Sequence, residues 1–136
     1  MRKTTIMFDT NIIISAGIYG STKLANLVND ISEEYEIVLS TAIIDELRRV
    51  IAKKWPKEEL KLENFLNKLG FELINTPTIL GDNYPKIRDV KDYPILASAI
   101  IGDVDVFITG DKDFKAINIE RPEIMTISEF EEEYLN

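Results

Sequence analysis

The chain has 136 residues, a formal net charge of −8 at pH 7, and neither histidine nor cysteine. Without these residues it cannot use Ser-His-Asp or Cys-His catalysis or a two-histidine ribonuclease mechanism, and it cannot build His/Cys zinc sites, iron–sulfur clusters or disulfides. Because acidic residues are in excess, binding of a nucleic acid would need a local basic patch or bound cations.

The length is typical of one domain, and no repeat or linker divides the chain. Only Ile6–Phe8 precede Asp9 as an apolar run, which is too short for a secretory signal. The longest uncharged stretch, Thr10–Thr22, is also too short to span a bilayer. We therefore expect a single cytoplasmic domain over residues 1–136, with no membrane segment.

Strands alternate with helices along the chain. The first half predicts, in chain order, a strand at Thr4–Phe8, a loop at Gly17–Ser21, helical spacing from Leu24 to Ile31, a strand at Glu36–Leu39 and a helix at Thr41–Lys54. The second half predicts a helix from Pro56 to near Gly70, a strand at Phe71–Ile74, an irregular stretch at Thr76–Val90, a helix from Asp92 to Ile101, strands at Asp105–Thr109 and Ile124–Ile127, and a final acidic helix. This order predicts an α/β fold, a three-layer α/β/α sandwich with a mostly parallel central sheet.

Three helix starts have residues suited to capping. Ser40 is expected to cap the helix that follows it, and Ser128 with Glu131 has the spacing of a capping box. Asp92 precedes a nearly all-apolar helix, which Gly102 is expected to close.

Two carboxylates follow buried strands. Asp9 comes directly after Ile6–Phe8, and Asp111 follows Val106–Gly110. Ligands of parallel α/β sheets bind at the carboxyl ends of the strands, so these acids are candidates for a shared site. For either acid alone, a role as turn residue or helix cap is an equal alternative.

Helical geometry separates Glu46 from its neighbour Asp45. On a helical wheel Glu46 lies at the border of the apolar stripe, where it can point toward a cleft, whereas Asp45 faces water. The residues alone favour a simpler interpretation, in which Glu46 pairs with Arg49 or lies near Lys53 on the helix surface. Asp92 also has two interpretations, as a helix cap or as an acid held close to the sheet by a buried helix.

Four segments together resemble the PIN-domain nucleases in order and spacing. They are Phe8-Asp9-Thr10-Asn11, Ile43-Ile44-Asp45-Glu46-Leu47, Asp92 followed by Ile95-Leu96-Ala97-Ser98-Ala99, and Thr109-Gly110-Asp111-Lys112-Asp113-Phe114. The resemblance covers essentially the whole chain as a single PIN-like domain. It is greatest to the small single-domain (VapC-like) members described as toxins of toxin–antitoxin pairs.

The resemblance implies an acidic site that binds Mg²⁺ or Mn²⁺, as one or two ions, and cleaves RNA. It assigns catalytic and metal-binding roles to Asp9, Glu46, Asp92 and Asp111, with Asn11, Thr109 and Asp113 in support. The segment Arg88-Asp89-Val90-Lys91-Asp92-Tyr93 departs from the subgroup, whose members often have a proline within it and another acid after its last Asp. Asp89 is therefore a further supporting candidate, and a shift of register would exchange its role with that of Asp92.

Oxygen ligands without imidazole or thiolate favour hard cations, in agreement with that implication. The expected reaction is hydrolysis that leaves 5′-phosphate and 3′-hydroxyl ends. Six basic against two acidic residues lie between Arg48 and Lys61, and Arg49 and Lys53 fall beside Glu46 on the wheel. We expect these two to position phosphates of the RNA, although a solvated helix face is the more common reason for such a pattern.

The resemblance also implies an antitoxin protein as a partner and a homodimer. The apolar run at Ile12–Ile14, or the residues Leu24, Leu27, Val28 and Ile31, could form a dimer contact, with burial in the core as the equal alternative. The competing functional hypothesis is a catalytically weak PIN fold that serves as an RNA- or protein-binding scaffold.

Overall fold

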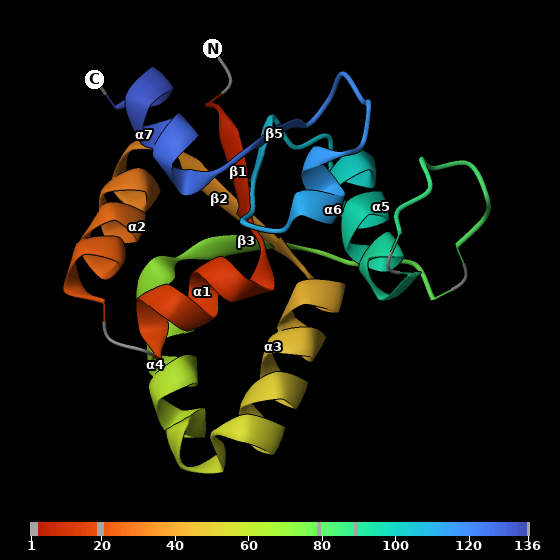
Figure 1. Cartoon of the computed structure of the whole chain (residues 1–136). Coiled ribbons are helices and arrows are strands. Elements are labelled where there is room, and N and C mark those ends of the chain that lie inside the picture. Colours follow the sequence, from red (N-terminus) through yellow and green to blue (C-terminus); the bar gives the residue numbers. More distant parts are fainter. Residues whose placement is uncertain (1–2, 19–20, 79, 89, 136) are drawn as a thin grey trace.

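The computed structural model describes residues 3–18, 21–78, 80–88 and 90–135. Its central sheet has five parallel strands in the order β3-β2-β1-β4-β5, as Figure 1 shows. The strands are β1 (Thr5–Phe8), β2 (Glu36–Ser40), β3 (Phe71–Ile74), β4 (Val106–Ile108) and β5 (Glu123–Met125). The predicted α/β fold with a parallel sheet is therefore confirmed.

Helices connect the strands and cover the sheet. They are α1 (Thr10–Gly17), α2 (Thr22–Glu34), α3 (Thr41–Lys54), α4 (Glu59–Leu69), α5 (Tyr93–Ile101), α6 (Lys112–Lys115) and α7 (Ile127–Tyr134), with short 3-10 turns η1 (Pro56–Glu58) and η2 (Val90–Asp92). In Figure 1, α2 and α7 lie on one side of the sheet and α5 on the other. The three layers follow from the sequence, because β1 and β4 are buried along their whole length and need cover on both faces.

Several local predictions agree with the structure residue by residue. The helix α3 and the strand β3 have the predicted bounds, and the Ser40 hydroxyl accepts a hydrogen bond from the Ile43 N–H at 3.3 Å. Gly70 ends α4 with a φ of 62°, a left-handed conformation that glycine adopts without strain. These elements were predictable because their periodicity and their end residues agree.

Two helices and one cap differ from the prediction. The helices α1 and α6 follow β1 and β4 almost directly, where the sequence predicted no helix. The capping box at α7 is formed by Thr126 and Glu129, so the predicted pairing of Ser128 with Glu131 was wrong. Both pairs have the same spacing, and the end of β5 at Met125 places Thr126 at the helix start.

The apolar runs considered for a dimer contact are largely buried within the chain. Ile12–Ile14 belong to the core beside β1, as do Val28 and Ile31 on α2, whereas Leu24 and Leu27 are half-buried. Among the described residues, none of the helices combines the length and apolar character needed to cross a membrane.

Candidate metal centre

The predicted strand-end acids lie where the chain reverses its direction of winding across the sheet. From β1 the chain builds β2 and β3 on one side and later places β4 and β5 on the other, so β1 and β4 are neighbours. The Asp9 N–H donates to the Ile108 carbonyl at 2.9 Å, which fixes the two strand ends together. Crevices at such switch points are the usual ligand sites of open parallel sheets.

A continuous set of hydrogen bonds joins the end of β1 to the end of β4. The Thr109 hydroxyl donates to Asp9 Oδ2 at 2.7 Å and accepts the Asp111 N–H at 3.0 Å. Asp111 Oδ1 in turn accepts the Asp113 N–H at 2.8 Å and caps α6. The fully buried Thr109 therefore fixes the positions of both acids.

Three carboxylates lie close together at this edge. One oxygen from each of Asp92, Asp111 and Asp113 lies within 4.8 Å of the other two, and all three residues are partly buried. Asp92 occupies the predicted N-cap position of α5, but its side chain makes no capping hydrogen bond there, which favours the second of the two interpretations given above. Its carboxylate is directed into the acidic group, with the apolar α5 holding its backbone in place.

Asp9 is the buried member of the site, with 5% of its surface exposed. Burial raises the pKa of its carboxyl, and the charge of Asp111 adds to this rise. Hydrogen bonds from the Thr109 hydroxyl and the Thr10 N–H act in the opposite direction and lower that pKa. The effect of burial exceeds that of these hydrogen bonds, so the pKa of Asp9 is raised overall.

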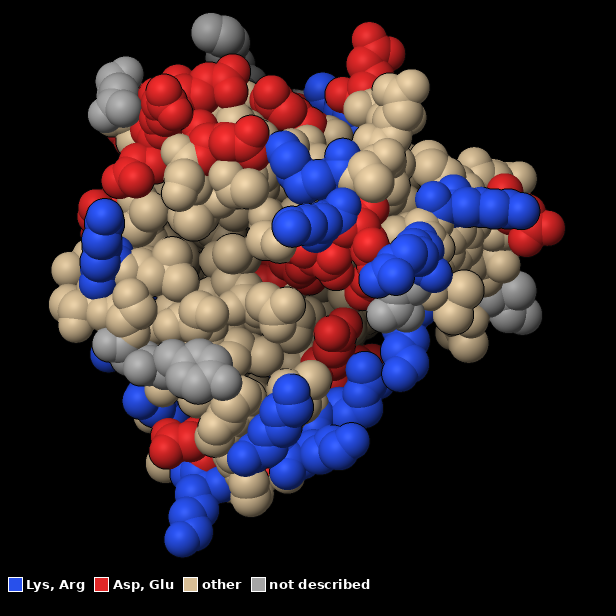
Figure 2. All heavy atoms as spheres, viewed as in Figure 1, with Lys and Arg blue, Asp and Glu red and all other residues tan. Residues whose placement is uncertain are grey.

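The donor set fits a hard divalent cation. It consists of carboxylate oxygens, and the neighbouring Thr10 hydroxyl is buried without a hydrogen-bond partner. A cation or its water shell would satisfy such an oxygen and offset the repulsion between the acids. The acidic residues form a hollow in Figure 2, with basic residues on its rim.

The remaining predicted residues lie around this group. Glu46 is half-buried on α3 while Asp45 is exposed, as the helical wheel predicted, although neither Glu46 nor Asp9 belongs to the group within 4.8 Å among the described residues. Asn11 is exposed on the first turn of α1, and Arg49 and Lys53 are exposed on α3. Asp89 lies outside the described residues.

Two contributors were not predicted from the sequence. Arg88, from the irregular stretch, pairs with Asp113 through Nε and Oδ1 at 3.0 Å. Thr10 donates its N–H to Asp9 Oδ1 at 2.8 Å, and its own hydroxyl is buried without a hydrogen-bond partner. The Asp111-x-Asp113 spacing after a strand could have indicated that both acids share one turn, whereas nothing local indicates Arg88.

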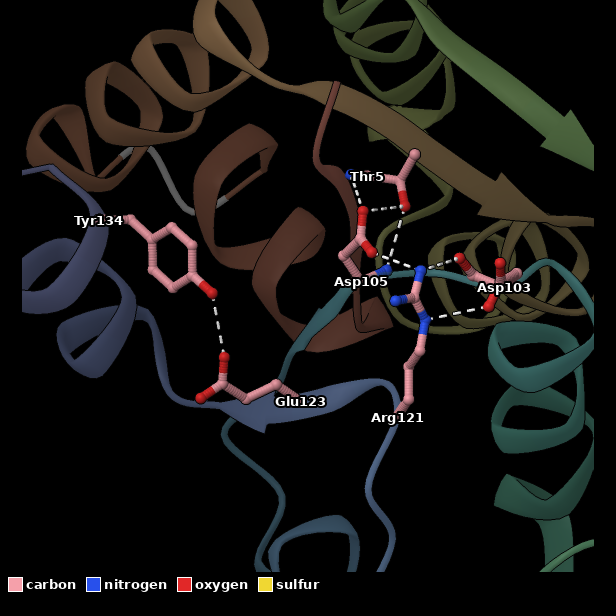
Figure 3. A network of polar contacts seen from close by, with 6 residues as sticks. All are labelled: Thr5, Asp103, Asp105, Arg121, Glu123 and Tyr134. Atoms are coloured by element: carbon pink, nitrogen blue, oxygen red, sulfur yellow. Dashed lines mark hydrogen bonds and ion pairs between the residues drawn. The ribbon is translucent and has the colours of Figure 1, made fainter. Parts of the chain in front are cut away.

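A second carboxylate cluster lies at the amino-terminal ends of β1 and β4, opposite the first (Figure 3). Asp105 Oδ2 accepts hydrogen bonds from the Thr5 N–H at 2.8 Å and from the Thr5 hydroxyl at 3.1 Å. Arg121 forms ion pairs with Asp105 and with Asp103, the latter at 2.9 Å. We call this the amino-edge cluster, and the group of Asp9, Asp92, Asp111 and Asp113 the carboxyl-edge cluster.

Comparison with known proteins assigns this arrangement to a described domain type. The sequence profile of the PIN domain matches residues 5–113, a range that includes all four residues of the carboxyl-edge cluster. No curated protein matches the chain. A similar solved structure is a chain of VapBC2 from Rickettsia felis, crystallised bound to a DNA fragment from their promoter, with a TM-score of 0.65 and 20% identity. That alignment covers 90% of this chain and 97% of the other.

Proposed function

The chain belongs to the PIN domain family, and from this premise we propose that it is a metal-dependent endoribonuclease and the toxin of a toxin–antitoxin pair. The observation that carries the proposal is the carboxyl-edge cluster, in which Asp92, Asp111 and Asp113 lie within 4.8 Å beside the buried Asp9. The fold similarity to VapBC2 supports the toxin–antitoxin part of the proposal.

Asp9, Glu46, Asp92 and Asp111 would hold one or two Mg²⁺ or Mn²⁺ ions, with Asn11, Asp89 and Asp113 in supporting positions. When bound, such a cation lowers the pKa of an attacking water and neutralises charge on the phosphate oxygens. The Thr109 hydroxyl donates a hydrogen bond to Asp9 Oδ2, which fixes the position of this carboxyl and lowers its pKa against the effect of burial. Hydrolysis would leave 5′-phosphate and 3′-hydroxyl ends.

The basic residues near the cluster would position the RNA. Arg49 and Lys53 are exposed on the helix that also carries Glu46, so they can bind phosphates on either side of the cleaved bond. Arg88, already paired with Asp113, adds positive charge beside the cluster. These contacts let a chain of net charge −8 bind a polyanion locally.

The same proposal includes an antitoxin protein partner, a homodimer, a single PIN-like domain over residues 1–136 and a cytoplasmic location. Its support is the family membership together with the 97% coverage of the VapBC2 chain. Copurification with the product of the neighbouring gene, followed by light scattering of the complex, tests the two partner assignments directly.

The decisive experiment is cleavage of defined RNAs with Mn²⁺, Mg²⁺ or EDTA. We expect cleavage with either cation, none in EDTA, and loss in Asp9→Asn and Glu46→Gln. Asp45→Asn is the matched control, because Asp45 adjoins Glu46 but faces water. Full activity in EDTA would refute the metal-dependent mechanism, and metal-loaded protein that binds RNA without cutting it would support the scaffold hypothesis instead.

A further inference from the structure

A second basic surface lies away from the carboxyl-edge cluster, between the end of α1 and the outer face of α4. It is a hollow of about 520 Å³ lined by three lysines, Lys57, Lys61 and Lys68, together with Gly17, Leu60, Asn64 and Phe65. None of the described residues that line it is acidic. In a chain of net charge −8, this lysine hollow is a local concentration of positive charge.

The lysines and the acidic residues of α4 lie on different faces of the helix. Lys61, Asn64, Phe65 and Lys68 recur at helical spacing, so they share the face that lines the lysine hollow. On another face Glu63 is already neutralised, because it forms an ion pair with Arg48 at 3.0 Å. The lysines are therefore separated from the acidic residues of their own helix.

Phe65, the aromatic residue of the hollow, can take its position only because residue 17 is a glycine. A Cβ atom at this position would lie 2.8 Å from Cγ of Phe65, so the Phe65 ring lies directly over the Gly17 backbone. Lys61 is held beside it, since its Nζ donates to the Ile18 carbonyl at 3.2 Å. A half-buried ring next to fixed positive charge is the combination that binds a base and its phosphate.

The spacing of the charges favours a polymer over a small anion. Lys57 lies in η1, just before α4, and Lys61 and Lys68 lie seven positions apart on α4, about 10 Å along the helix, which is more than one phosphate group can bridge. The helix α1 links the two sites, because it begins at Thr10 beside Asp9 and ends at Gly17, about 12 Å away. Figure 2 shows basic residues along this part of the same face, over α3 and α4.

We propose that the lysine hollow binds the sugar–phosphate backbone of a single-stranded nucleic acid, on one flank of the bond that is cleaved. The lysines contact successive phosphates, and Phe65 contacts one base without reading its identity. This inference rests on the proposed function, and it adds a place where the substrate is held beyond the cleavage site.

The test measures binding of a long, fluorescently labelled oligouridylate in EDTA, so that metal-dependent cleavage plays no part in the result. In Lys57→Glu/Lys68→Glu, we expect the slope of log K against log salt to fall by about 1.4, the value for two phosphate contacts on a single strand. The affinity at low salt should fall about ten-fold or more. Lys57→Arg/Lys68→Arg should bind as the unmodified chain does.

The matched control is Lys3→Glu/Lys23→Glu, which changes the charge equally at exposed lysines that do not line the hollow. An equal loss of RNA affinity in this control would show that binding depends only on net charge, and it would overturn the proposal. Phe65→Leu keeps apolar volume and should weaken binding about five-fold without changing the salt slope. Since binding is read without cleavage, a chain that fails to cut RNA still gives a decisive result here.

Two further outcomes would overturn the proposal. One is an unchanged salt slope in Lys57→Glu/Lys68→Glu. The other is a change of mass by light scattering in that variant with RNA binding unaltered, which would assign the lysine hollow to contact with a second copy of the chain.

Discussion

The two carboxylate clusters, at opposite ends of β1 and β4, share one hydrogen-bonding arrangement but differ in how the charge of their acids is neutralised. At the amino edge the Thr5 hydroxyl donates to Asp105 and accepts the Asp105 N–H; at the carboxyl edge the Thr109 hydroxyl donates to Asp9 and accepts the Asp111 N–H. The difference is in the neutralising charge. Arg121 pairs with both acids of the amino-edge cluster, whereas burial raises the pKa of Asp9.

The source of the neutralising charge distinguishes the two clusters. In the amino-edge cluster Arg121 supplies positive charge to both acids. In the carboxyl-edge cluster Arg88 pairs with Asp113, and Asp9 stays buried with a raised pKa. A buried carboxylate with a raised pKa opposes folding in its ionised form and gains from a cation supplied by the solvent.

The largest expected difference is in RNA cleavage. Asp111→Asn should lower kcat/KM at least about a hundred-fold, because it removes a charge from the proposed metal site. Asp105→Asn, at the amino edge, should keep activity within a few-fold when assayed at a temperature at which it stays folded. Equal losses in both variants would show that the two clusters do not differ in function.

Metal should stabilise the chain only through the carboxyl edge. At about a hundred times Kd, Mn²⁺ should raise the free energy of unfolding by about 2.7 kcal/mol, and Asp111→Asn should abolish the gain while Asp103→Asn keeps it. Thermal unfolding with and without Mn²⁺ measures this effect.

The pH dependence follows from the raised pKa of Asp9. The folded chain binds this proton more tightly than the unfolded chain, so the metal-free contribution to stability is present at acid pH and is lost as pH rises through the folded pKa. The gain from Mn²⁺ should change in the opposite direction and shrink as pH falls, since protons compete for Asp9. A metal effect that stays constant from acid to neutral pH would contradict this assignment.

Removal of one acid from each cluster should change stability in opposite directions. Asp105→Ala leaves the Thr5 N–H without its carboxylate acceptor and should lower the free energy of unfolding by about 2 kcal/mol. Asp9→Asn should raise it in metal-free buffer at neutral pH, because the buried charge is removed while the amide oxygen can still accept from Thr109. Urea denaturation in EDTA measures both, and destabilisation by Asp9→Asn would contradict the interpretation.

The smallest expected effect is a loss of stability at alkaline pH through ionisation of Tyr134, which lies beside the amino-edge cluster. Burial, with the hydrogen bond to Glu123 and its charge, raises the pKa of Tyr134 to about 12. The neutral phenol therefore contributes stability that is present below the ordinary pKa near 10 and is lost as pH rises through about 12. Ultraviolet titration of Glu123→Gln should show a lower tyrosine pKa, with Glu120→Gln as the exposed control.

The sequence predicted those parts of the fold in which local signals agree. The bounds of α3 were predictable because its apolar period and the Ser40 cap coincide. The short helix α1 was not, since Ile12–Ile14 form a continuous apolar run that has no helical period. At α7, two serine or threonine caps with equal spacing competed, and only the end of β5 decided between them.

The candidate site divides in the same way. Asp9 and Asp111 could be found because parallel strands bring their carboxyl ends to one edge. The close approach of Asp113 depends on the turn in which Asp111 accepts its N–H, and the contribution of Arg88 depends on how a long irregular segment folds back. Such tertiary contacts leave no periodic pattern in the sequence.

The Thr109 hydroxyl affects which parts of the chain can change in length without disturbing the acidic cluster. It joins Asp9 to Asp111 through one oxygen atom, although about a hundred residues separate the two acids along the chain. Insertions or deletions in the α3–α4 hairpin or in the irregular stretch after β3 therefore leave the spacing of these acids unchanged. We expect relatives of this chain to differ in the lengths of these two segments while they keep a threonine or serine at position 109.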